Sequence, residues 1–352
     1  MPSRLSRRTM TLASAGFLVV LLSAIAALLP VPYVALSPGP TTNTLGSVDG
    51  TELIHIAGHK TYPDSGHLNL TTVSVLGGPS QRMDLVTALR GWLDGTIAII
   101  PEEQVYPQGQ TAKQSEQESN DEMRDSQESA TTAALRSLGF SIPTHAAVNA
   151  IAAGSPATGK LRPNDEIIQV DGKPITGGAA LRALITAHKA GDPVAFVIER
   201  GGKRSDVTVT TEKAPQGGRT IVGITTRDVA DYPFTVKIGL KDVGGPSAGL
   251  MFALGIVDKL TPGSLTGGAF VAGTGTIDDS GNVGPIGGIT QKMIAARRAG
   301  ATVFLAPSGD CAEAISTVPN GLHLVRITSL TSALDSLKAL RANRNAKVPA
   351  CS

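Results

Sequence analysis

Gly244-Gly245-Pro246-Ser247-Ala248-Gly249-Leu250 leads directly into the apolar run Met251–Val257. A serine on a turn of small residues at the start of a helix lies where unpaired backbone N–H groups and the positive end of the helix dipole converge. That position suits a nucleophile. The same residues also build an ordinary capped helix start, so this stretch alone leaves both interpretations open.

Two further motifs rich in small residues follow this stretch. Thr274 lies in Phe270–Asp278, and the turn Gly281–Gly288, which contains Pro-Ile-Gly-Gly, leads to Lys292. The three motifs in this order resemble the proteolytic domain of the Lon family. The resemblance implies Ser247 as the nucleophile, Lys292 as its base and Thr274 as a supporting residue beside the lysine.

The chemistry explains why these residue types occur together. A serine hydroxyl is a poor nucleophile until a base takes its proton, and lysine is a base only as the neutral amine. We therefore expect Lys292 to be buried in an apolar setting, which disfavours its charge. A hydroxyl such as that of Thr274 can orient the amine. The backbone N–H groups of Gly245, Ser247 and Ala248 are candidates for an oxyanion hole, whereas a proline has no N–H to donate.

Earlier segments extend this resemblance. Gly66–Thr72 and Met123–Ala130, which reads Met-x-x-Ser-x-x-x-Ala, are similar to the beginning of the Lon proteolytic domain. Residues 111–135 form a polar run that predicts a long exposed helix. Leu85–Leu93 has apolar residues at helical spacing, and we expect Trp92 within it to be a packing anchor.

Between the two parts lies a segment with its own motifs. The Ser-Pro-Ala turn at Gly154–Ala157, then Leu161–Ile168 and the Asp-Gly hairpin at Val170–Gly172, resemble the PDZ domain of bacterial membrane-associated proteases. The match runs from about Phe140 to Lys213. Asn164 stands where that family has glycine, and asparagine tolerates the left-handed backbone that such a turn needs.

PDZ domains bind extended peptide tails by adding a strand to a sheet edge beside a helix. The resemblance implies a groove between two segments close to the start and the middle of this module. The residues expected to line it are Gly139, Phe140, Ile142, Leu181 and Ile185.

The N-terminus predicts a membrane segment. Met10–Pro30 is almost entirely apolar or small, and Arg4, Arg7 and Arg8 precede it. About 20 apolar residues match the thickness of a bilayer core, and the basic flank stays on the cytoplasmic side. We expect a retained single-pass anchor in the cell membrane, with a cytoplasmic N-terminus and an extracytoplasmic catalytic part. A cleaved signal peptide is the alternative, since Ala24–Ala26 has the small residues of a cleavage site.

The chain has two cysteines, Cys311 and Cys351. An extracytoplasmic location permits a disulfide, which would fasten the C-terminal tail, while two free thiols remain the alternative. The spacing of cysteines and of the six histidines gives no metal site.

Composition limits the function classes. The 352 residues suggest about two domains, and a net charge of +2 gives no reason to expect a nucleic-acid partner. No Gly-x-x-x-x-Gly-Lys-Ser/Thr loop occurs, so we expect no ATP-driven unfolding part and no cofactor. The combined resemblance is to membrane-anchored bacterial PDZ-containing Lon-like serine proteases, whose domains commonly form rings such as hexamers.

We therefore expect an α/β (α+β) Lon-type proteolytic domain with an inserted β-rich PDZ domain and an N-terminal transmembrane helix. The expected function is an ATP-independent serine endopeptidase that cleaves unfolded or exposed peptide segments. The alternative is a non-catalytic, membrane-anchored PDZ scaffold with an inactive protease fold. The expected layout is a cytoplasmic tip and anchor at 1–32, a linker at 33–47, protease parts at 48–139 and 214–345, the PDZ domain at 140–213 and a tail at 346–352.

Overall fold

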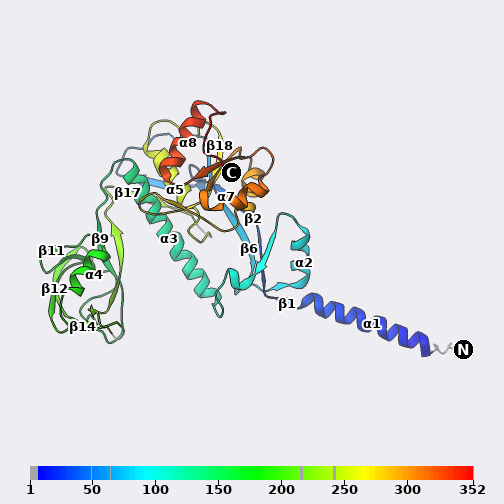
Figure 1. Cartoon of the computed structure of the whole chain (residues 1–352), viewed down its shortest axis with the longest axis horizontal. Coiled ribbons are helices and arrows are strands. Elements are labelled where there is room, and N and C mark those ends of the chain that lie inside the picture. Colours follow the sequence, from blue (N-terminus) through cyan, green and yellow to red (C-terminus); the bar gives the residue numbers. More distant parts are fainter. Residues whose placement is uncertain (1–6, 49, 64, 215–216, 241–242, 352) are drawn as a thin grey trace. The chain divides into compact units, whose positions relative to one another are not determined.

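The computed structural model describes residues 7–48, 50–63, 65–214, 217–240 and 243–351, which form two compact units (Figure 1). Unit 2 comprises Gly139–Thr235, and unit 1 comprises the described residues before and after it. The part of the predicted cytoplasmic tip that carries Arg4 lies outside the described residues.

A mixed sheet of six strands forms the centre of unit 1. Its first four strands are parallel, and the last two are antiparallel to their neighbours. The sequence part after unit 2 supplies three neighbouring strands of this sheet and the part before unit 2 supplies the other three, so neither part can complete it alone. In spatial order the strands are β22 (His323–Ile327), β21 (Val303–Pro307), β18 (Phe270–Gly273), β6 (His67–Gly77), β2 (Tyr33–Asn43) and β8 (Ala98–Pro101).

Helices and short strand pairs complete unit 1. The strand pairs are β1 (Pro30–Val31) with β7 (Met83–Asp84), β3 (Ser47–Val48) with β4 (Thr51–Glu52), β5 (Ile54–Ala57) with β17 (Thr235–Ile238), and β19 (Thr276–Ile277) with β20 (Val283–Gly284). The helices are α1 (Arg7–Leu28), α2 (Leu85–Leu93), α3 (Ala112–Ser137), α5 (Gly249–Leu260), α6 (Ile289–Ala299), α7 (Cys311–Ala314) and α8 (Leu330–Ala342).

Two of these helices show how the sequence pattern determines burial. Every residue of α5 is buried, because its apolar residues surround the whole helix and not one stripe. The predicted long helix is α3, which starts with a capping box between Thr111 and Gln114. Its buried residues begin at Met123 and include the continuous run Ala130–Leu135, whereas the part before Met123 has none, so the helix is exposed throughout its first half and only in part after it.

Unit 2 is an antiparallel sheet with one helix. The strand order is β13 (Lys203–Thr210), β12 (Pro193–Arg200), β10 (Glu166–Val170), β9 (Thr144–Ile151) and β16 (Ile224–Ala230). The remaining elements are β11 (Lys173–Pro174), α4 (Gly178–Thr186), β14 (Glu212–Lys213) and β15 (Thr220–Ile221).

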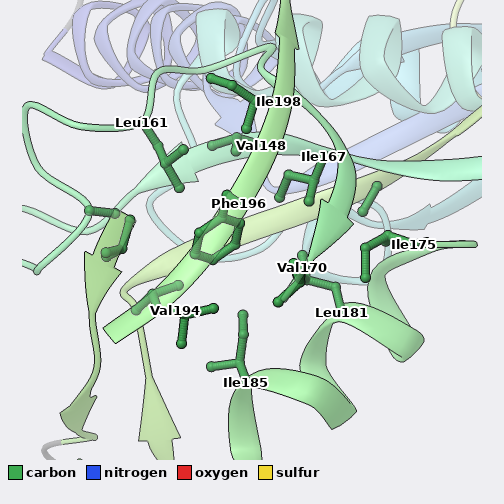
Figure 2. Packing of buried hydrophobic residues seen from close by; sticks show 14 residues of the cluster. Val148, Leu161, Ile167, Val170, Ile175, Leu181, Ile185, Val194, Phe196 and Ile198 are labelled. Atoms are coloured by element: carbon green, nitrogen blue, oxygen red, sulfur yellow. The ribbon is translucent and has the colours of Figure 1, made fainter. Parts of the chain in front are cut away.

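The core of unit 2 is aliphatic. Phe196, Val170 and Leu181 point toward one another between the sheet and α4 in Figure 2. Asn164 has a φ of 68°, which confirms the left-handed turn expected there. The predicted architecture, an α/β domain interrupted by an inserted β-rich domain, is confirmed.

Two expectations about the chain's layout and one about Trp92 need correction. Residues 33–47 are not a linker, because β2 pairs with both β6 and β8 in the middle of the sheet. Unit 2 continues to Thr235 and not to 213, because β16 pairs with β9 along its whole length. Trp92 is 55% exposed, so it is not a buried packing anchor, although its ring edge meets Tyr33.

The two ends of the chain have distinct structures. Arg8–Ala26 of α1 is long and apolar enough to cross a membrane, a property that an N-terminal signal sequence shares. At the other end, a disulfide joins Cys311 to Cys351. The tail also runs beside β22, where the Arg326 N–H donates to the Pro349 carbonyl at 2.8 Å.

Candidate active site

Ser247 lies on the turn that enters α5, two residues before the helix begins at Gly249. Gly245 has a φ of +81°, a left-handed conformation that glycine adopts without strain. This sharp turn leaves Ser247 partly exposed, whereas Ala248 and all of α5 behind it are buried. The predicted serine is thus presented at the surface by a rigid, fully buried helix.

A second turn holds the serine from the other side. The Ser247 carbonyl accepts hydrogen bonds from the Gly275 N–H at 2.8 Å and from the Thr274 hydroxyl at 3.0 Å. In return, the Leu250 N–H donates to the Gly275 carbonyl at 3.1 Å. These three bonds fix the backbone of Ser247 relative to the end of β18.

Lys292 is placed by the first turn of α6. Its N–H donates to the carbonyl of Gly288, the residue that precedes α6. Gly288 has a φ of +69° and lies close to Val73 of β6. The lysine side chain is only 2% exposed, and its Nζ donates to the Thr274 Oγ1 at 3.2 Å. Thr274 is completely buried, and its hydroxyl bonds both the lysine and the serine backbone.

Burial changes the chemistry of this lysine. It lowers the pKa of Lys292 from 10.5 to about 8, while the nearby Asp310 carboxylate acts in the opposite direction. With a pKa of about 8, the Lys292 amine is neutral in roughly a tenth of the molecules at pH 7. An ordinary lysine is neutral in about 1 molecule in 3000 at that pH. The site therefore supplies an amine base at neutral pH.

The hydrogen bonds also orient that amine. Thr274 uses its hydroxyl proton on the Ser247 carbonyl, so its oxygen can accept an N–H from Lys292. A neutral amine that donates one N–H to Thr274 keeps its lone pair for another partner. The Ser247 hydroxyl forms no hydrogen bond among the described residues.

Asp310 supports the turn before Lys292, and sequence reasoning missed it. Its carboxylate accepts the N–H of Ile286 at 3.1 Å, which fixes the Pro-Ile-Gly-Gly turn. Burial raises the pKa of Asp310, whereas the hydrogen bond from Ile286 and the charge of Lys292 lower it. Asp310 immediately precedes the disulfide-bonded Cys311, so the tail is joined to the residue that supports this turn.

Two serines on α3 support the nucleophile's turn. Ser126 Oγ donates to the Pro246 carbonyl at 2.9 Å, and the Ser119 carbonyl accepts the Gly245 N–H at 2.9 Å. They lie seven positions apart and so face the same side of the helix. The Met-x-x-Ser-x-x-x-Ala stretch already contained Ser126, but its spacing gave no indication that it contacts the nucleophile's turn.

One of the three N–H groups expected to form an oxyanion hole is already hydrogen-bonded within the protein. The Gly245 N–H is occupied by Ser119, so it cannot donate to a substrate in this conformation. Among the hydrogen bonds of the described residues, none uses the N–H of Ser247 or Ala248. These two groups, at the start of α5, remain candidates for stabilising an oxyanion.

Unit 2 has a groove, but one of its walls is not the predicted one. A cavity of about 590 Å³ lies along α4, where Leu181 and Ile185 contribute to its lining as expected. The opposite wall is Arg219–Thr226, which leads into the edge strand β16. Gly139, Phe140 and Ile142 do not line it.

The reason for this error is topological. Ile142 is buried, and Phe140 packs edge-on against Phe234, with ring centroids 5.4 Å apart. The strand beside the helix comes from the end of unit 2, because β16 and not the segment before β9 forms the sheet edge. In the sequence, the apolar run Ile221–Ile224 with Gly223 inside it is the signal that could have located this strand. In the structure Gly223 has a φ of +80°.

Comparisons with known proteins agree with these two units. Residues 116–211 match the PDZ domain family, and residues 235–338 match the Lon protease (S16) C-terminal proteolytic domain. The chain therefore contains a PDZ domain and a Lon-type proteolytic domain. The PDZ match begins inside α3, earlier than unit 2 itself.

The curated relatives are Lon proteases. Over 92 residues the chain is 37% identical to Lon protease of Clostridioides difficile (strain 630). The aligned segment covers 26% of this chain and 11% of that protein. Over 107 residues it is 37% identical to Lon protease 1 of Bacillus subtilis (strain 168), covering 30% of this chain and 13% of that protein. The chain thus spans only about a tenth of the length of these relatives.

Solved structures include PDZ domains. The PDZ domain of an SdrC-like protein from Listeria monocytogenes is 23% identical and covers 23% of this chain and 85% of that chain, with a TM-score of 0.22.

Proposed function

We propose that this chain, which combines a PDZ domain with a Lon-type proteolytic domain, is a serine endopeptidase with Ser247 as nucleophile and Lys292 as general base. One observation carries the proposal. Lys292 is buried, its pKa is lowered to about 8, and its Nζ bonds the same Thr274 hydroxyl that bonds the Ser247 carbonyl. A surface lysine has none of these features.

The proposed reaction has two steps. In the first, the neutral Lys292 amine takes the Ser247 proton while Oγ forms a bond to the peptide carbonyl carbon. The N–H groups of Ser247 and Ala248 stabilise the oxyanion, and Lys292 returns the proton to the departing amine as the C–N bond breaks. In the second, Lys292 deprotonates a water molecule, which releases the acyl group and restores Ser247.

We further propose that the groove of unit 2 binds peptide tails. β16 is a sheet edge beside α4, so an extended peptide can add a strand there. The lining is mostly apolar and includes Arg182 and Arg219 but no carboxylate, which favours tails that combine aliphatic and acidic groups. Binding there would deliver substrates to the protease or restrain it.

The proposed location is the cell membrane. Arg8–Ala26 is long enough to span a bilayer, and arginines at its start favour a cytoplasmic N-terminus. A disulfide at Cys311 and Cys351 fits an oxidising, extracytoplasmic compartment. The substrates would then be unfolded or exposed segments of extracytoplasmic or membrane proteins, cleaved without ATP.

Digestion of an unfolded protein tests this function. The full chain in lipid nanodiscs should cleave β-casein without ATP, and Ser247→Ala should not. Ser280→Ala, at an exposed serine on the same unit, is the matched control and should cleave at the wild-type rate. Equal cleavage by wild type and Ser247→Ala would reject the nucleophile, and no cleavage by either would favour the scaffold alternative.

A further inference from the structure

The helix α2 has an apolar face that points away from the protein. Its other face is packed, since Ala88 and Gly91 are buried and a Cβ added at Gly91 would meet the side chain of Ile99. On the outer side, Leu89 is 46%, Trp92 is 55% and Leu93 is 88% exposed. The protein thus exposes its only tryptophan together with two leucines.

These three side chains form one surface. Positions i, i+3 and i+4 lie on the same face of a helix, so Leu89, Trp92 and Leu93 are neighbours. Outside α1, no large apolar side chain of the described residues is more exposed than Leu93. A contiguous apolar face on a short surface helix indicates an interaction surface.

The position of α2 in the chain indicates what that surface meets. α1 ends at Leu28, and the next residues form β1, which pairs with β7 immediately before α2. The Leu85 N–H at the start of α2 donates to the Leu29 carbonyl at 3.3 Å. The first turn of α2 is therefore hydrogen-bonded to Leu29, the residue that directly follows α1.

We propose that Leu89, Trp92 and Leu93 enter the interface of the membrane in which α1 is anchored. This inference rests on the proposed anchoring of α1. Because the start of α2 is fixed at the end of α1, the outer face of α2 lies at the depth of the lipid headgroups and upper acyl chains. Tryptophan is enriched at that depth, where its ring meets both apolar chains and water.

The charges near α2 are compatible with this placement. Arg82 and Arg90 are exposed and can contact lipid phosphates. The two carboxylates that flank the helix are already bonded, Asp84 to the Thr87 N–H at 2.8 Å and Asp94 to the Thr96 N–H at 2.9 Å. Both are held by the protein backbone and stay close to it.

A second copy of the chain is the competing occupant. A stable protein interface buries about 800 Å² on each partner, more than three side chains on a nine-residue helix can provide. A membrane imposes no such requirement, because the anchor already holds the helix at the lipid surface. The size of the face therefore favours lipid over protein.

Trp92 makes the proposal testable, because it is the only tryptophan and reports on this face alone. The full chain would be reconstituted in phosphatidylcholine–phosphatidylglycerol vesicles with and without lipids brominated at acyl carbons 6 and 7. We expect brominated lipid to reduce the Trp92 emission about twofold, since interfacial helices lie roughly 5–10 Å into the headgroup–acyl boundary. Aqueous iodide should quench it only weakly.

Two results would overturn the proposal. Strong quenching by iodide without quenching by brominated lipid would leave Trp92 in water, and quenching by neither would mean that protein covers it. A separate variant, Trp92→Phe with Phe17→Trp in α1, tests the anchor alone. If its emission is quenched by brominated lipid while that of Trp92 is not, the anchor stands and the α2 inference fails.

A variant pair checks the role of the leucines. Leu89→Gln with Leu93→Gln keeps Trp92 as the reporter and should raise its iodide quenching while removing most of the quenching by brominated lipid. Ile315→Gln with Val318→Gln, at two other exposed apolar positions, is the matched control and should leave the Trp92 signal unchanged. Unchanged quenching in the α2 pair would also contradict the proposal.

Discussion

The proposed catalytic centre of unit 1 and the proposed peptide groove of unit 2 have opposite physical requirements. Lys292 and Thr274 are buried and hydrogen-bonded, which is what the proposed role requires, because a base must be neutral and oriented before substrate arrives. The groove is open, and its edge strand leaves backbone groups for an incoming peptide. The proposed catalysis thus depends on desolvation of an amine, and the proposed recognition depends on a free edge of a sheet.

The two sites should therefore respond differently to substitution. A change that affects the buried amine should remove catalysis and leave tail binding intact, and a change in the groove should do the reverse.

The largest effect is expected for Lys292→Met. Without the base, cleavage of β-casein should fall at least about 10⁴-fold, as for other members of catalytic groups that act as a unit. Binding of a labelled tail peptide to unit 2, measured by fluorescence anisotropy, should not change. Loss of both activities would contradict the separation of the two sites.

The same variant should be more stable than the wild type. At pH 7 the folded wild-type protein holds a charged amine in a buried site, and its pKa shift from 10.5 to about 8 corresponds to a cost of about 3 kcal/mol. Because the folded pKa is below the unfolded one, this cost is full below pH 8 and disappears as the pH rises toward 10.5. Urea denaturation should show the gain of Lys292→Met at pH 7 and little gain at pH 10.5.

The next effect is that of Cys351→Ser. The disulfide closes a separation of 40 residues, so its loss should lower the free energy of unfolding of unit 1 by about 4 kcal/mol in the chain-entropy model. Trp92 fluorescence in denaturant follows unit 1, and tail binding by unit 2 should be unaffected. Wild type in reductant should behave like the variant, and identical midpoints with and without reductant would contradict the bridge.

Thr274→Val should have an intermediate effect. Valine keeps the shape but loses the bonds to Lys292 and to the Ser247 carbonyl, which should reduce kcat by about 10- to 100-fold. Thr274→Ser keeps the hydroxyl and is the matched control. If both variants lose activity equally, packing and not the hydrogen bonds explains the loss.

Arg182→Glu together with Arg219→Glu tests the groove. Reversing both charges should weaken binding of an acidic tail peptide about 10-fold, since the arginines are exposed and screened by salt. Lys203→Glu, on an exposed strand of the same unit, is the control. Cleavage of a short peptide that lacks such a tail should stay at the wild-type rate in both variants.

The smallest effect is expected for Asp310→Asn. The amide keeps an acceptor for the Ile286 N–H but removes the charge that raises the pKa of Lys292. The acid limb of the pH–rate profile should therefore move to lower pH. A limb that moves to higher pH would show that Asp310 does not act through the charge of Lys292.

The sequence predicted which residues meet at the proposed catalytic centre better than it predicted the groove, for a physical reason. Ser247 and Thr274 lie in short turns of small residues and Lys292 follows another such turn by one helical turn, and turns of this kind encode their own backbone geometry. Their pairing through Thr274 requires only that α5, β18 and α6 be neighbours in one sheet-based domain.

What could not be predicted depends on pairing between distant segments. Whether β16 or the segment at 139–142 forms the edge of unit 2 is decided by strand order, which no local pattern contains. Likewise, the contacts of Ser126 with the nucleophile's turn and of Asp310 with Ile286 join segments that the sequence does not bring together. The exposure of Trp92 follows from which face of α2 packs on the sheet, and an apolar helix of this length leaves that choice open.

The most direct test of the central claim is the pH dependence of Ser247 acylation. A peptidyl β-lactone would be added to wild type and Lys292→Met between pH 6 and 10, and the adduct would be located and timed by intact mass and peptide mapping. We expect an adduct on Ser247 whose rate rises about tenfold per pH unit and levels off above a pH of about 8, with none on Lys292→Met. A rate that does not depend on pH, or equal acylation of Lys292→Met, would contradict the account.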